Sequence, residues 1–222
     1  MFLSTFTLQT VGLKQVISIA NSAYPLSAVM VVLWSRFPIF GKILLAQFND
    51  KCPYTVPFYR VKDNSLSDVE YLLACGYSLK GDGTLETDES FLNKMRALVR
   101  LYAGIIQSNV ISPPLGLQVA WRWLASILSM EPRAKITPAV LYGFLSVMHH
   151  RLYTAYHKQY VKLVDFIAKD YMARMVSVYS KEDNRQSLGQ LETYLENIRR
   201  EMKSGQMPPM PEGHIHHIPE DF

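Results

Sequence analysis

Apolar residues recur at helical spacing along almost the whole chain, and the strict alternation typical of β-strands is nearly absent. In residues 88–108, for example, Phe91, Met95, Leu98 and Tyr102 are three or four positions apart, as one face of a helix requires. The same periodicity predicts nine helices. They cover residues 9–20, 25–36, 38–49, 68–75, 88–108, 115–130, 137–153, a stretch around 161–171, and 184–203.

Local signals set several of these helix ends. Ser67 and Glu70 have the spacing of a capping box, in which each side chain bonds to the free backbone N–H of the other residue. Gly76 can adopt the left-handed conformation that ends a helix. Thr137 precedes a proline, the pattern of an N-cap followed by a first-turn proline, and predicts the start of helix 137–153.

Eight or nine helices joined by short turns predict an all-α fold of stacked antiparallel helix pairs. No sequence repeat marks a regular solenoid. We expect one helical domain over residues 24–205, with the apolar stripe of helix 184–203 docked on it. Residues 206–222 contain four prolines and three histidines and predict a flexible tail.

The composition suits a packed core, because 49% of the 222 residues are hydrophobic and only 19% are charged. The net charge of +4 is small and the basic residues are scattered, which disfavours an RNA-binding helical repeat and sequence-specific nucleic-acid binding. The apolar run 24–34 is about half the length of a membrane span, so we interpret it as a buried helix. Cys52 and Cys75 have no CxxC spacing, which predicts reduced thiols in the cytosol or nucleus.

No pattern in the chain points to catalysis. The sequence has no Gly-x-Ser-x-Gly or His-Glu-x-x-His motif, and Gly41-Lys42 is not followed by the Ser or Thr of a phosphate loop. His149 and His150 are expected on a solvated helix face, and the three histidines of the tail have no partner cysteine. The sequence therefore predicts a protein that is not an enzyme and has no metal site.

Residues 48–59 are the most distinctive stretch, because a helix end is followed there by two prolines and several aromatic residues. Pro53 and Pro57 fix φ and have no N–H, so the helix must stop, and we expect one extended course that presents Lys51. Basic residues gather around this stretch in the sequence, although an ordinary solvated surface is the interpretation that sequence alone favours. These residues are Lys42, Lys51, Arg60 and Lys62.

Trp121, Arg122 and Trp123 form the second distinctive stretch. Two tryptophans two positions apart lie on roughly opposite sides of a helix, so at least one is expected in the core while the other can line an interface. Simple core packing is the alternative for both. Arg122 is expected to pair with a carboxylate.

Four stretches, taken in order, resemble the C-terminal helical domain of the Gle-one family of mRNA-export nucleoporins. The most specific is Lys-Cys-Pro-x-x-Val-Pro at residues 51–57, and the others lie at residues 24–34, 99–107 and 116–132. The similarity spans residues 24–203, whereas residues 1–23 form a divergent N-terminal segment. The residues that carry the structural motif are Cys52, Pro53, Pro57, Arg100, Trp121, Arg122 and Trp123.

The resemblance implies a HEAT-like stack of helices that binds and activates a DEAD-box RNA helicase, stimulating its ATP turnover and its release of RNA. It implies a location at the cytoplasmic side of the nuclear pore complex, with access to nucleus and cytoplasm. Other partners implied are an FG nucleoporin with a Gle-binding motif and translation initiation or termination factors. A non-activating helical scaffold that binds a nucleoporin peptide remains the alternative function.

Inositol hexakisphosphate is the ligand that the resemblance implies, held by lysines between the two proteins. One lysine pair of fungal members is placed just before the Cys-Pro of the motif, and the matching positions here are Asp50 and Lys51. One lysine is therefore replaced by an acid. We expect weak binding and no required cofactor, with Lys51, Lys42, Arg60 and Lys62 as the candidate ligands.

Overall fold

The computed structural model describes residues 15–63, 65–108, 114–181, 183–205 and 207–210. In that part of the chain the fold is all-helical, with eight α-helices, short 3-10 turns and one π-helical turn, as the sequence predicts. The elements in order are η1 (Ala20–Ser22), α2 (Ala23–Arg36), α3 (Pro38–Lys51), η2 (Pro53–Thr55), α4 (Asp68–Ala74), α5 (Asp88–Gln107), α6 (Leu117–Ser129), α7 (Ile136–Phe166), the π-helical η3 (Ile167–Tyr171), α8 (Met172–Ser177) and α9 (Gln186–Lys203). None of the helices described is both long and apolar enough to cross a lipid bilayer.

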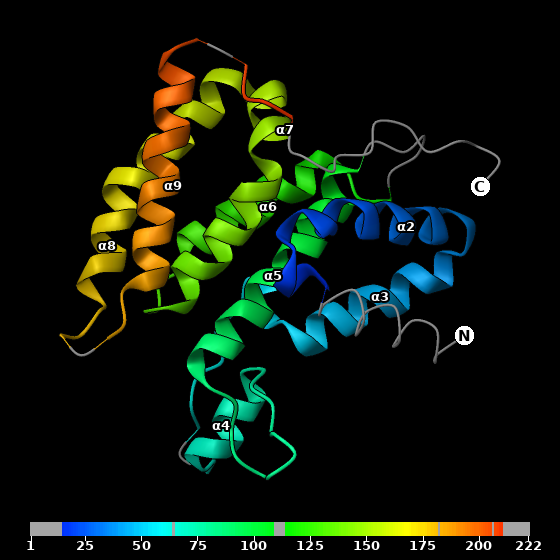
Figure 1. Ribbon diagram of the computed structural model, residues 1–222, viewed down its shortest axis with the longest axis vertical. Helices are drawn as coiled ribbons and strands as arrows, with labels where there is room; N and C mark the ends of the chain where they lie inside the picture. The colour runs from blue at the N-terminus through cyan, green and yellow to red at the C-terminus, as the bar shows by residue number, and fades with distance from the viewer. Residues whose placement is uncertain (1–14, 64, 109–113, 182, 206, 211–222) are drawn as a thin grey trace.

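Helix α5 lies at the centre of the molecule. It packs against α2 on one side and against α7 on the other, and α7 in turn packs against α9. Figure 1 shows the α2–α3 hairpin on one flank, α8 and α9 on the opposite flank, and α4 beyond the end of α5. Gly104 allows α2 to approach α5 closely, because a Cβ there would lie 2.1 Å from Ser27 Oγ. The arrangement explains why the apolar positions of α5 cover most of its circumference.

The predicted helix ends are confirmed where local chemistry sets them. Ser67 and Glu70 form the reciprocal capping box at the start of α4. Gly76 and Gly205 have φ of 103° and 72°, the left-handed conformation that ends α4 and α9. The apolar stripe of α9 is buried, as expected for a docked helix. The predicted helix 9–20 is described only from residue 15, and residues 211–222 of the predicted tail lie outside the described part.

The prediction that Thr137 is the N-cap of α7 was wrong, and the break predicted near residue 153 lies a few residues further along. The helix begins at Ile136 after Lys135, which has φ 66°, and Thr137 lies inside the first turn rather than at the cap. Two helical stretches meet at His157 (φ 41°, ψ −117°) within Ile136–Phe166, so the first runs only a few residues beyond the predicted end near residue 153. No proline or glycine interrupts residues 154–166, so the sequence contains no stop signal there.

The expectation that His149 and His150 are solvated was also wrong. His149 is 8% exposed, and its Nδ1 lies 3.0 Å from the hydroxyl of Tyr160, which comes from beyond the kink. Burial, helped by His150, lowers the pKa of His149 to about 4. The Nδ1 of His150 lies 2.8 Å from the carbonyl oxygen of Pro208. Partners far along the chain cover both rings, and helical periodicity could not reveal them.

Candidate partner-binding site at residues 51–59

The signature segment, residues 51–59, leaves the end of α3 and passes over the α6–α7 side of the molecule. Lys51 is the last residue of α3, and Pro53 starts a single 3-10 turn. Thr55 closes that turn, since its N–H and its hydroxyl both donate to the carbonyl oxygen of Cys52, at 3.0 and 2.8 Å. Extended backbone begins only at Val56, so the expectation of one extended course from the first proline onward was wrong.

Trp123 holds the base of the signature segment. Its indole Nε1 donates to the carbonyl oxygen of Tyr54 at 2.8 Å, and its ring stacks on Phe144 with centroids 4.1 Å apart. Trp123 is 3% exposed, whereas Trp121 is half-buried against Tyr156, 4.6 Å away. The prediction that at least one tryptophan lies in the core is confirmed.

Cys52 is fully buried beside this base. Burial raises the pKa of its thiol to about 12, which leaves it protonated and unreactive at neutral pH. Cys75 is also a buried free thiol. The cysteine of the motif is therefore a packing residue.

Arg133, which sequence reasoning missed, forms a second anchor. Its guanidinium lies 4.9 Å from the centre of the Tyr59 ring, and it donates to the hydroxyl of Tyr71 at 3.0 Å and to the carbonyl oxygen of Arg60 at 2.8 Å. The hydroxyl of Tyr59 also lies 2.5 Å from that of Thr137. These contacts tie the signature segment, α4 and the start of α7 together. No helical spacing relates them, so only the folded chain shows them.

The four candidate basic residues do not form one compact cluster. Lys42 and Lys51 are nine positions apart on α3, which places them on opposite sides of the helix and about 13 Å apart along its axis. Lys51 pairs with the neighbouring carboxylate of Asp50 at 2.9 Å, and Lys62 pairs with Asp68 at 2.5 Å. The Lys62 pair lowers the pKa of the exposed Asp68 carboxyl. Arg60 is exposed, and its carbonyl oxygen rather than its side chain joins the Arg133 anchor.

Apolar side chains are exposed on the outer side of the same region. Val56 and Phe58 are each 54% exposed, and Val61 is 82% exposed. Residues two apart in extended backbone lie on the same side of the chain, so Val56 and Phe58 form an apolar strip. Exposed apolar groups next to one another make this strip a candidate partner-binding surface.

Pro57 is half-buried in this strip. Arg100 is half-buried on α5, with its guanidinium 5.4 Å from the centre of the Tyr142 ring. Arg122 is exposed, and no carboxylate of the described residues lies within 4 Å of it. The expected carboxylate pair of Arg122 is therefore wrong, because α6 points this side chain away from the helices that pack on it.

Comparison with known proteins places this geometry in context. A family model described as GLE1-like protein matches residues 9–168. The mRNA export factor GLE1 of Rattus norvegicus is 34% identical over 212 residues, which are 92% of this chain and 29% of the relative. That of Danio rerio is 37% identical over 169 residues, 73% of this chain and 24% of the relative. The chain thus spans less than a third of these relatives, and the match is to their C-terminal region.

A solved structure has the same fold. It is the Saccharomyces cerevisiae complex of the Dbp5 L327V C-terminal domain with Gle1 and IP6, which matches with a TM-score of 0.77 at 20% identity. The match covers 94% of this chain and 69% of the other. A second such complex, with Gle1 H337R, matches with a TM-score of 0.76 at 19% identity.

Proposed function

The chain belongs to the GLE1-like family, and from that premise we propose that it binds a DEAD-box RNA helicase and stimulates its ATP turnover and release of RNA. The observation that carries the proposal is the likeness, over 94% of this chain, to a Gle1 chain bound to the Dbp5 C-terminal domain and IP6. The relatives are named as mRNA export factors and not as enzymes. In this proposal the chain acts on a helicase and carries out no catalysis itself.

The signature segment, with the exposed strip of Val56 and Phe58 on its outer side, forms the proposed helicase contact. Trp123 and Arg133 hold the segment from behind, through its Tyr54 carbonyl and its Tyr59 ring. Val56 and Phe58 remain more than half exposed on the outer side. A preorganised surface of this kind binds without the entropic cost of ordering a loop.

Inositol hexakisphosphate is a weak ligand in this proposal. The Lys51 ammonium already contacts the carboxylate of Asp50 at 2.9 Å, and both side chains are more than half exposed. A phosphate group must displace that carboxylate or be repelled by it, whereas a lysine at position 50 would add an attraction. The contact between the chain and the helicase therefore depends little on the inositol phosphate.

In the cell, the proposed location is the cytoplasmic side of the nuclear pore complex. An FG nucleoporin with a Gle-binding motif is the proposed anchor there, and translation factors are further proposed partners. These assignments rest on family membership alone.

An ATPase assay tests the proposal. The purified chain is titrated into a DEAD-box helicase with RNA, and we expect a saturable increase in ATP turnover. Phe58→Ser should raise the chain concentration needed for half-maximal stimulation at least tenfold. Val29→Ser, at an exposed position of α2, is the matched control and should leave that concentration unchanged. Binding in a pull-down without any stimulation would support the scaffold function instead, and absence of binding would exclude both.

Calorimetry tests the ligand. Asp50→Lys should tighten binding of inositol hexakisphosphate, most clearly at low salt, because exposed charges are screened. Lys51→Gln should weaken it. Lys42→Gln, on the opposite side of α3, is the control. Tight binding by the wild type that ignores Asp50→Lys and Lys51→Gln would show that the site lies elsewhere.

A further inference from the structure

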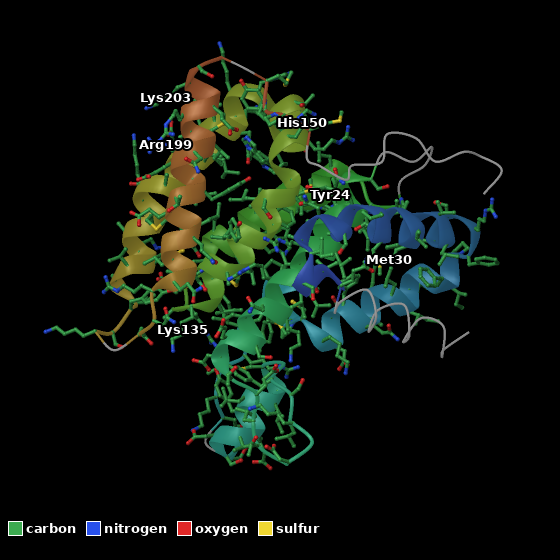
Figure 2. All side chains as sticks on the ribbon, in the orientation of Figure 1. Tyr24, Met30, Lys135, His150, Arg199 and Lys203 are labelled. Carbon is green, nitrogen blue, oxygen red and sulfur yellow. The ribbon has the colours of Figure 1, made fainter. Side chains whose placement is uncertain are left out.

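A furrow separates α5 from α9. Both helices pack against α7, and the space between them forms a pocket beside Lys135, which lies near the lower end of α9 in Figure 2. Its polar lining includes Asp88, Glu89, Asn93, Arg96, Lys135 and Gln190, with Asn184, Gln186 and Ser187 beside them. A second hollow continues along α9, lined by Tyr142, Gln190, Thr193 and Tyr194, and the two share Gln190.

Two arginines in this region have no acidic side chain as a partner. Arg96 and Arg100 are one turn apart on the same face of α5, and their guanidinium carbons lie 5.6 and 5.4 Å from the centre of the Tyr142 ring. No carboxylate of the described residues lies within 4 Å of either guanidinium, although seven ion pairs of lysine or arginine form elsewhere in that part of the chain. Burial lowers the pKa of both groups, and Arg100 lowers that of Arg96 further. Arginine nevertheless remains charged at neutral pH.

Polar atoms on both walls of the furrow lack a hydrogen-bond partner. The Nε of Arg96 and the Oε1 of Gln190 are each buried and unpartnered. The Nη1 of Arg96 makes only a long contact, 3.4 Å, to Asn93. Oxygen and nitrogen of an amide are interchangeable in assignment, so Gln190 can also present its NH2 group to the furrow. Buried donors without partners are rare in native proteins and ask for a ligand or another explanation.

From these observations we propose that the furrow binds a single carboxylate group, supplied by an acidic side chain of a partner protein. Arg96 lines the pocket, and its Nη groups can donate to a carboxylate there, while Arg100, one turn away, adds the field of a second charge. Gln190 contributes a third donor from α9. The proposal does not depend on helicase binding.

The charges around the furrow favour one carboxylate over a polyphosphate. Asp88 is already paired with Lys135 at 3.0 Å, and Lys135 also contacts Asp183 at 3.3 Å, so this group of two carboxylates and one ammonium carries one negative charge. Glu89 is exposed on the rim. Together with Glu89, that group balances the two arginines, so the furrow has no excess of positive charge to hold a polyphosphate, whereas a single carboxylate can pair with a guanidinium that has no acidic partner.

The second hollow favours a peptide over a free carboxylate. Tyrosine, threonine and amide groups line this hollow, and none of its lining residues is charged. Such groups suit the backbone and neutral side chains that flank an acidic residue. A partner segment lying along α9 would place its acid between α5 and Gln190.

Nuclear magnetic resonance of the whole chain tests the proposal, with the Nε–H signals of arginine as the readout. Sodium acetate replaces sodium chloride at constant ionic strength. The chemical shift of the Arg96 signal should change with acetate concentration and reach a plateau. The peptide acetyl-Gly-Glu-Gly-amide should produce the same shift at a concentration at least tenfold lower, and its Gln counterpart should produce none. In Arg96→Gln, which has no Arg96 signal, the Arg100 signal should no longer respond, whereas in Arg200→Gln, at an exposed position of α9, the Arg96 and Arg100 signals should still respond.

Three results would overturn parts of this inference. If neither acetate nor the Glu peptide causes a saturable change in the Arg96 chemical shift, the proposed site does not exist. This result comes from the wild type, so it stands even if Arg96→Gln fails to fold. Saturation by inorganic phosphate without saturation by acetate makes the ligand a phosphate. Equal affinity for acetate and the Glu peptide makes it a free carboxylate rather than a partner side chain.

Discussion

The signature segment and the α5–α9 furrow both place arginine against a tyrosine ring, yet they differ in what the guanidinium bonds to. Arg133 lies over Tyr59 and also donates to the Tyr71 hydroxyl and the Arg60 carbonyl. Arg96 lies over Tyr142 and leaves its buried Nε–H without an acceptor. The same aromatic contact is part of a completed network in one region and of an incomplete one in the other.

The difference follows from the backbone around each arginine. Arg133 lies in a loop and faces another loop, where carbonyl oxygens such as that of Arg60 are free to accept. Arg96 lies between helices, whose carbonyls are already bonded along their own axes. A buried cation between helices therefore needs an acceptor from a side chain, water or a ligand.

The largest expected effect tests the base of the completed network. Trp123→Ala removes the stacking on Phe144 and the hydrogen bond to Tyr54, and should lower the free energy of unfolding by about 3–5 kcal/mol. Trp121→Ala, at the half-buried neighbour, should cost about 1–2 kcal/mol. Urea denaturation followed by circular dichroism measures both. Equal losses would mean that the signature segment does not depend on its buried base.

His149 extends the comparison to a third buried group, because its Nε2 also lacks a hydrogen-bond partner. Its pKa falls from an ordinary 6.5 to about 4, so between these values the unfolded chain binds more protons than the folded one. Stability from this group is present above pH 6.5 and is lost as the pH falls toward 4, at most about 3 kcal/mol. Melting curves from pH 7 to 4 should show the loss, and His149→Gln should reduce it. An unchanged pH profile in the variant would assign the loss to other groups.

Arg133→Met tests the completed network directly. It keeps much of the packing on Tyr59 but removes two hydrogen bonds, and should cost about 1–2 kcal/mol. Chemical denaturation at neutral pH provides the measurement. A change near zero would show that water replaces both bonds without loss.

The smallest effect is expected at Arg96. Arg96→Met removes an unpartnered buried charge and its repulsion with Arg100, so the free energy of unfolding should change by no more than about 0.5 kcal/mol or should increase. The same denaturation series compares it with Arg133→Met. If both variants lose equal stability, Arg96 has a structural partner and the comparison between the two regions fails.

The sequence predicted the elements near α4 and α9 well because their signals are local. The Ser67–Glu70 box and the terminal glycines act within one helical turn, and the stripe of α9 depends only on spacing. The candidate basic residues were less predictable. Neighbours in the sequence, such as Lys51 and Asp50, pair with each other, whereas Lys42 lies on the other side of its helix.

By itself, the sequence determined the all-helical class, the positions of most helices, the burial of one tryptophan and the family, since periodicity, capping and motif order are properties of the chain. Only the tertiary structure decided that Thr137 meets Tyr59, 78 positions away, and that His149 is covered by Tyr160 across a kink. It also decided which arginines find acceptors. Burial and hydrogen bonding depend on what the rest of the fold brings near a side chain, and residue spacing carries no information about such distant partners.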